Sequence, residues 1–185
     1  MRAVCESTER VVANIGPAQY ELPTPCSEWT VRELLNHLVG TLHLGAALLT
    51  DQTPPTNAGP DDPPTNDFIG DDPAGAYRAG VDPLVAATTP AAVGGMHATP
   101  LGEMPGVALA GFCALDVLVH GWDLAKATGQ SADIDPALAQ PLLDFARQSV
   151  SEDMSTRGQR IGPKVAPPRD ADAMAQLIAY MGRTP

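Results

Sequence analysis

The stretch DVLVHGWD, residues 116–123, lies late in an apolar segment that runs from about Met104 to Gly129. We expect this segment to form one long helix. Side chains four positions apart lie within about 40° of each other around a helix, so the Asp116 carboxylate and the His120 imidazole project from one face on successive turns. The pair therefore offers two metal-ligand atoms on one edge of the helix.

The face that carries Asp116 and His120 is otherwise mostly apolar. An isolated buried charge is too costly to keep, so each group must be hydrogen-bonded, ion-paired or metal-bound. Two interpretations stay open at this point. Asp116 and His120 pair with each other around a polar pocket in the core, or they share a metal, which needs at least a third ligand.

A second helix is predicted from about Thr30 to Thr50, because Thr30-Val31-Arg32-Glu33 has the capping-box pattern just before a leucine-rich run. The leucines form its buried side, and His37 lies at the margin of that side, facing inward. His37 is thus the candidate third ligand, with a hydrogen-bonded core histidine as the alternative. His43 falls on the polar back of the same helix and is expected to be solvated.

The other segments predict four further helices and two irregular connections. We expect a short amphipathic helix within residues 1–15, a helix over 74–89 kinked or restarted at Pro83, one over 136–154 and a short one over 170–181. Residues 51–75 are rich in proline and aspartate and predict a long, mobile connection. Residues 91–105 predict a crossover loop in which His97 is a surface histidine.

Composition limits the classes of function and cellular location. The chain has 185 residues, which suits a single domain over 1–185, and its 22 acidic against 11 basic side chains give a net charge of −11. This charge repels phosphate backbones and anionic membranes, so nucleic acid is not expected as a partner. No signal peptide or membrane span is indicated, and a cytoplasmic protein is predicted. Cys5, Cys26 and Cys113 are scattered and are predicted to be reduced thiols.

Three segments together carry a resemblance to a known family: PCSEWTVRELLNHL at residues 25–38, GEMPG at 102–106 and DVLVHGWDLA at 116–125. In this combination the chain resembles the mycothiol-dependent maleylpyruvate isomerase N-terminal domain family, the actinobacterial branch of the DinB-like metal-binding superfamily. The resemblance covers nearly the whole chain. It implies an all-α fold, a DinB-like four-helix bundle with long crossover loops and a short C-terminal helix, forming a single metal-binding domain.

The resemblance also implies a site. In the family a divalent metal, usually zinc, is held by a histidine of the second helix and by a carboxylate and a histidine four residues apart on the long helix. Carried over, these ligands are His37, Asp116 and His120. Asp116 stands where the isomerase has the longer Glu, and the isomerase's second domain has no counterpart before Pro185, which argues against maleylpyruvate isomerisation itself.

Three nitrogen and oxygen ligands leave an open position on a tetrahedral zinc, as in catalytic sites. The resemblance implies that a low-molecular-weight thiol such as mycothiol binds there. The predicted function is a metal-dependent thiol S-transferase or isomerase-like enzyme acting on a small electrophilic substrate. The alternative is a non-catalytic metal-binding bundle that acts as a sensor or interaction module. A homodimer stays open as the assembly.

Asp123 is a further candidate, one turn beyond His120. It is placed to orient an imidazole N–H or a cofactor amine as an outer partner of the metal ligands, and a solvated carboxylate near the helix end is the alternative. Trp29 and Trp122 are placed in the core rather than in a pocket.

Overall fold

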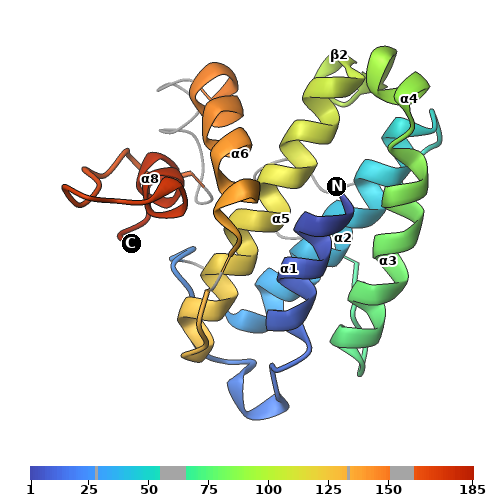
Figure 1. Ribbon diagram of the computed structural model, residues 1–185. Coiled ribbons are helices and arrows are strands. Elements are labelled where there is room, and N and C mark those ends of the chain that lie inside the picture. Colours follow the sequence, from blue (N-terminus) through green and yellow to red (C-terminus); the bar gives the residue numbers. More distant parts are fainter. Residues whose placement is uncertain (28, 55–65, 133, 151–160) are drawn as a thin grey trace.

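Four of the described helices form a closed ring in the computed structural model, which describes residues 1–27, 29–54, 66–132, 134–150 and 161–185. These helices are α1 (Arg2–Val12), α2 (Val31–Leu49), α3 (Pro73–Ala87) and α5 (Gly106–Thr128). Helix α1 packs against α3 and α5, and α2 packs against the same two (Figure 1). The predicted four-helix bundle is confirmed.

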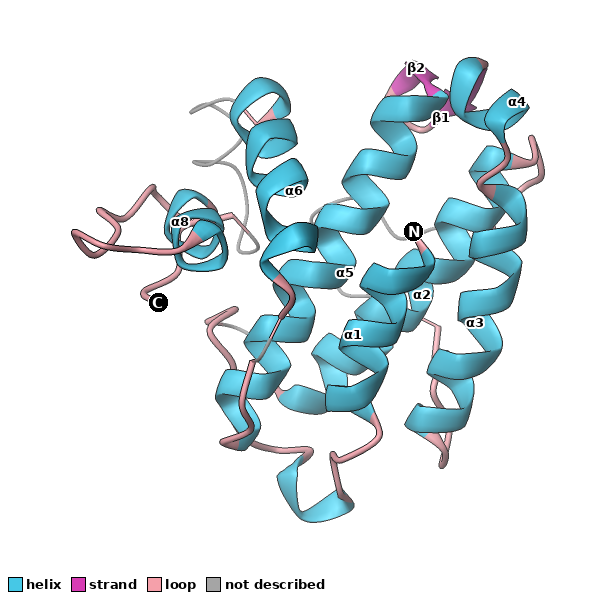
Figure 2. Cartoon of the chain, viewed as in Figure 1, coloured by secondary structure: helices cyan, strands magenta, loops and turns pink. Residues whose placement is uncertain are grey.

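Further described elements lie around this bundle (Figure 2). They are η1 (Pro17–Gln19), α4 (Pro90–Gly94), β1 (Met96–Thr99), β2 (Gly102–Pro105), α6 (Pro136–Ser149) and α8 (Ala173–Tyr180). Helix α6 packs on α5, and α8 packs on α6, on the side of the bundle away from α3 (Figure 1). Helices α6 and α8 therefore form a second layer, which packs on α5 through α6.

Helix α2 begins at the predicted capping box. The Thr30 hydroxyl accepts a hydrogen bond from the Glu33 backbone N–H at 3.3 Å, and the Glu33 carboxylate accepts one from the Thr30 N–H at 2.8 Å. Such reciprocal bonds satisfy backbone donors that the helix cannot satisfy itself. They fix the start of the helix two turns before His37, which points the histidine toward α5.

Helix α5 is long and apolar enough to cross a membrane by length and composition alone, with a mean hydropathy of 1.5 over its most apolar window. Within the bundle, 67% of that window is buried, because α5 contacts α1 on one side, α2 on another and α6 on a third. A helix covered on most sides is expected to be apolar on most sides. It ends at Gly129, whose φ of 69° is the left-handed conformation that glycine adopts at helix ends.

Gly121 allows α1 to approach α5 closely beside His120. A Cβ atom at this position would collide with the side chain of Thr8. The Thr8 hydroxyl in turn donates a hydrogen bond to the Val117 carbonyl oxygen at 3.0 Å. The close contact holds this part of α5 in a fixed rotation.

Two predicted segments differ in detail from the structure. Helix α3 continues through Pro83 without a restart. The segment over 91–105 is not a simple loop, since it forms α4 and an antiparallel hairpin of β1 and β2. The tip of the predicted mobile connection falls on residues 55–65, and the end of the predicted 136–154 helix falls on 151–154. Both lie outside the described residues.

The prediction that His97 is a surface histidine is wrong, and His43 is only partly solvated. His97 is only 5% exposed: its Nδ1 lies 2.9 Å from the Asp51 carboxylate and its Nε2 lies 2.8 Å from the Ala92 carbonyl oxygen. His43 is half-buried, with its ring centroid 5.9 Å from that of Phe68. The contacts with Asp51 and Phe68 join segments distant in sequence, which helical periodicity does not report.

We predict that His97 gives the fold a pH-dependent share of stability. Both ring nitrogens face acceptors, so the hydrogen bond to Ala92 and the one to Asp51 raise the pKa of His97 above its usual value. A raised pKa means that this share is complete below about pH 6.5 and is lost as the pH rises through the folded-state pKa. His97→Gln should therefore destabilise the protein more at about pH 5.5 than at about pH 8.5 in urea unfolding. A difference in unfolding free energy that does not change with pH would contradict this.

Candidate metal centre

Side chains from α2 and α5 meet where the two helices pack. The Asp116 Oδ2 atom lies 3.1 Å from His37 Nε2, and its Oδ1 atom lies 3.3 Å from His120 Nε2. The two imidazole rings stand edge to face, with centroids 5.1 Å apart. All three ligand atoms lie within 4.8 Å of one another, so the structure brings together the three residues that the sequence singled out.

The donor set fits a divalent metal. Two imidazole nitrogens and one carboxylate oxygen are the donors that zinc accepts in catalytic sites. Ligand atoms about 2.0–2.2 Å from a tetrahedral zinc lie roughly 3.3–3.5 Å apart, close to the two distances that Asp116 makes with the histidines. Small side-chain shifts would therefore suffice to bind an ion. The assignment of His37, Asp116 and His120 as metal ligands stays a prediction.

Asp116 pairs with both imidazoles. Its Oδ2 atom also accepts a hydrogen bond from the Thr41 hydroxyl at 2.8 Å. Desolvation raises the pKa of Asp116, but the charges of His37 and His120 outweigh it and hold that pKa well below its usual value. The two interpretations of the Asp116–His120 pair are thus compatible, because the ion-paired state presents the same atoms that a metal would bind in exchange for protons.

Trp29 forms one wall of this cluster. The indole is buried, and its ring centroid lies 4.7 Å from that of His37 and 6.2 Å from that of His120. It therefore belongs to the core, as predicted, and also borders the candidate ligands. Trp122 is buried as well, with the Lys126 ammonium 5.3 Å above its ring.

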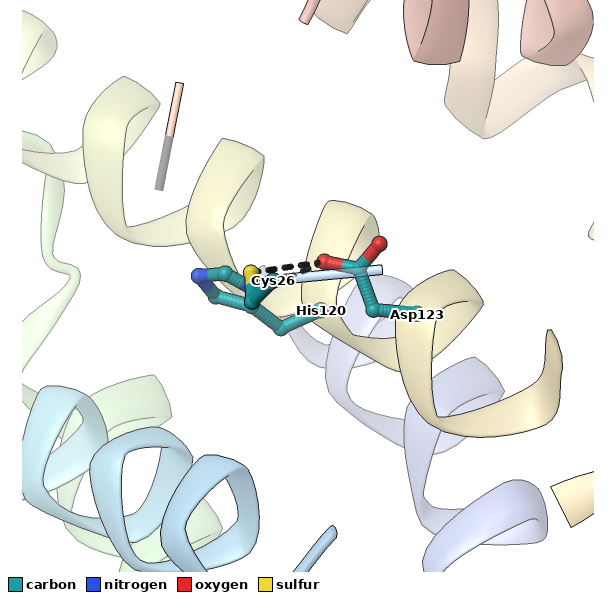
Figure 3. Close-up of side chains that lie close together, drawn as sticks. All are labelled: Cys26, His120 and Asp123. Carbon is teal, nitrogen blue, oxygen red and sulfur yellow. Dashed lines mark hydrogen bonds and ion pairs between the residues drawn. The ribbon is translucent and has the colours of Figure 1, made fainter. Parts of the chain in front are cut away.

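A second group of possible ligands shares His120 and lies on the other side of its ring (Figure 3). Asp123 Oδ2 accepts a hydrogen bond from His120 Nδ1 at 2.9 Å. The Cys26 thiol lies 3.5 Å from the same oxygen and 3.7 Å from His120 Nδ1. Asp123 has no exposed surface, so the solvated alternative is wrong, and the carboxylate occupies the position expected of a group that orients the imidazole.

Arg183 completes this second group, and sequence reasoning missed both it and Cys26. Its Nη2 atom lies 2.8 Å from Asp123 Oδ2 and 3.0 Å from Cys26 Sγ. Contacts over 60 and 157 positions leave no periodic signal in the sequence. Because the guanidinium already supplies a positive charge here, a metal is expected at His37, Asp116 and His120 instead.

The remaining cysteines are buried free thiols, as predicted. Burial raises the pKa of Cys113 to about 12 and that of Cys5 to about 11. Cys113 lies one turn before Asp116 on the same stripe of α5, yet it packs against the Cα of Gly45 on α2. It acts as a small apolar side chain rather than as a thiolate.

The chain is similar to a known protein family, to two relatives and to a solved structure. Residues 1–125 match the family model of the mycothiol maleylpyruvate isomerase N-terminal domain. The chain is 40% identical over 177 residues to the uncharacterized proteins Rv0738 and MT0763 of two strains of Mycobacterium tuberculosis, covering 94% of this chain and 90% of each relative. A crystal structure of a mutant of the mycothiol-dependent maleylpyruvate isomerase has the same fold, with a TM-score of 0.58 and 16% identity over 82% of this chain and 70% of that one.

We predict that Cys26 is not a metal ligand, although it lies near His120. Cys26→Ser should leave the metal content of the purified protein unchanged, at about one ion per chain, because the assigned ligands are untouched. Without added thiol, the Co²⁺ form of the wild type should show no thiolate-to-cobalt absorption band. Loss of the ion in Cys26→Ser, together with such a band in the wild type, would assign the metal to Cys26, His120 and Asp123.

Proposed function

The chain belongs to the mycothiol maleylpyruvate isomerase N-terminal domain family, and we propose that it is a metal-dependent enzyme that uses a mycothiol-type thiol on a small electrophilic substrate. The reaction is either S-transfer or an isomerisation through transient thiol addition. The observation that carries the proposal is the convergence of His37, Asp116 and His120 at one point between α2 and α5. The metal is proposed to be zinc, which these donors suit.

A divalent metal at this point would lower the pKa of an incoming thiol, so that the reactive thiolate is available at neutral pH. The chain's own residues prepare the position. Asp116 brings one negative charge, which offsets part of the charge of a cation, and Thr41 holds its carboxylate by a hydrogen bond. Asp123 holds His120 from the far side of the ring.

The exposure of the three residues supports a reactive site rather than a closed structural one. The side chains of His37 and His120 are almost fully covered, whereas that of Asp116 keeps 26% of its surface. The cluster is therefore reached from the Asp116 side and covered by protein elsewhere, including Trp29 over the His37 ring. An open position on one side is what catalytic metal sites keep for substrate.

The proposed partners are a low-molecular-weight thiol and an electrophilic metabolite. A net charge of −11 argues against nucleic acid. Three free cysteines and a thiol-dependent chemistry suit the reducing cytoplasm. The alternative function is a metal-binding bundle without turnover, acting as a sensor or interaction module.

We predict that His37→Ala and His120→Ala each weaken zinc binding by more than about 100-fold, since changes to outer partners of ligands alone cost about 10–100-fold. Both variants should stay helical, because the α2 leucines that fill the core are untouched. The matched control is His43→Ala, on the same helix but outside the cluster, which should bind zinc like the wild type. Titration against a chromophoric chelator measures the affinities. Equal zinc affinity in all four proteins would refute the site.

We further predict metal-dependent turnover. The zinc-loaded protein should accelerate conjugation of a low-molecular-weight thiol with a generic aryl halide at least about 100-fold over background, within the range of single catalytic effects. Removal of zinc, or His37→Ala, should return the rate to background. A protein that binds zinc and thiol but shows no turnover across a panel of electrophiles would favour the non-catalytic alternative.

A further inference from the structure

Arg183 lies in the segment after α8 and is 5% exposed. Its guanidinium contacts both oxygens of Asp123: Nε donates to Oδ1 at 3.2 Å and Nη2 donates to Oδ2 at 2.8 Å. The same Oδ2 accepts the hydrogen bond from His120 Nδ1. A continuous chain of contacts thus runs from the C-terminal segment to a candidate metal ligand.

The two-point contact determines how Asp123 sits. A carboxylate without any exposed surface is expensive to bury unless a cation and hydrogen bonds compensate it. A guanidinium that contacts both oxygens also fixes the plane of the carboxylate, which a single point charge would not do. Without Arg183, Asp123 would have to take up a proton or turn away from its present position.

The orientation of Asp123 decides the orientation of His120. With Nδ1 donating to Asp123, the other nitrogen, Nε2, faces Asp116 Oδ1 at 3.3 Å. A histidine that donates its free N–H to a carboxylate is a better oriented and more basic metal ligand. Cys26 covers the remaining side of this contact, since its sulfur accepts from Arg183 Nη2 and touches the carboxylate that Figure 3 shows beside it.

We propose that Arg183 is a positioning residue of the metal centre, which holds Asp123 and, through it, turns His120 Nε2 toward the metal. The proposal rests on the proposed function, because it takes His120 to be a ligand. It goes further in one respect: Arg183 lies outside residues 1–125, the part that the family model matches. The segment that follows α8 thereby supplies a part of the site, so the C-terminal layer does more than cover the bundle.

The experiment compares zinc affinity in Arg183→Gln, Arg183→Lys and Asp123→Asn by chelator competition. Arg183→Gln and Asp123→Asn should each lose about 10–100-fold in affinity. Arg183→Lys should lie between them and the wild type, because lysine keeps the charge but not the two-point geometry. The double variant should lose little more than either single one, since both changes act through the same contact.

Two matched controls separate positioning from simple docking of the C-terminal layer. Leu177→Ala removes a fully buried side chain of α8, and Arg147→Gln removes the 3.0 Å hydrogen bond to Gln176. Neither residue is among the described hydrogen-bond partners of Asp123. Both should lower the unfolding free energy while zinc affinity stays within about twofold of the wild type. The visible spectrum of the Co²⁺ form, which reports ligand geometry, should change in Arg183→Gln and not in Leu177→Ala.

The outcomes decide between the proposals. A wild type without measurable zinc affinity refutes the metal centre itself. A wild type that binds zinc, with Arg183→Gln equal to it in affinity and Co²⁺ spectrum, refutes the role of Arg183 alone. Equal losses of affinity in Arg183→Gln and Leu177→Ala refute it also, since docking would then explain both. Should Arg183→Gln fail to fold, Arg183→Lys and Asp123→Asn carry the same comparison.

Discussion

The row of side-chain contacts from Asp116 through His120 to Asp123 is the constraint on which this structure depends. One imidazole is held between two carboxylates, with Nε2 toward Asp116 and Nδ1 toward Asp123. Burial alone lowers the pKa of His120, yet the Asp116 charge and the hydrogen bonds around the ring raise it well above its usual value. For Asp123 the directions are opposite: burial raises the pKa of its carboxyl, and the contacts with His120 and Arg183 bring that pKa below its usual value. Each charged group is therefore tolerable inside the bundle only because its neighbours are placed as they are.

These placements come from local features that the sequence displays and from packing that it does not. The i, i+4 spacing of Asp116 and His120 and the capping box at Thr30 are local, so both could be predicted from one stretch of chain. The inward direction of His37 followed from helical periodicity. Their meeting point depends on how closely α2 and α5 approach, which the resemblance to a family with this fold supplied and periodicity alone did not.

The parts that could not be predicted are contacts between distant segments and short strands that carry no clear periodic signal. Arg183 and Cys26 meet across 157 positions. Cys26 belongs to the PCSEWTVRELLNHL segment, but nothing in that segment indicates a contact with Arg183. The hairpin of β1 and β2 was hidden because Gly102, with a φ of 106°, and the nearby prolines signal a turn without identifying the short strands that flank it. A surface position was predicted for His97 because its partners, Asp51 and Ala92, lie on two segments whose sequences both resemble loops.

His120 belongs to two groups of potential metal ligands, and the difference between them lies in the cation that each can hold. On the Nδ1 side, a guanidinium is covalently part of the chain, buried, and matched to both oxygens of Asp123. On the Nε2 side, the described hydrogen bonds and ion pairs of Asp116 are to two imidazoles and a hydroxyl, and the proposed cation would replace them by displacing protons. The His120 ring thus lies between the permanent cation of Arg183, which it meets through Asp123, and the proposed metal position beside Asp116. Arg183 compensates the Asp123 carboxylate on the Nδ1 side. The arrangement that makes His120 tolerable in the core therefore also favours the Asp116 side as the proposed position for a metal.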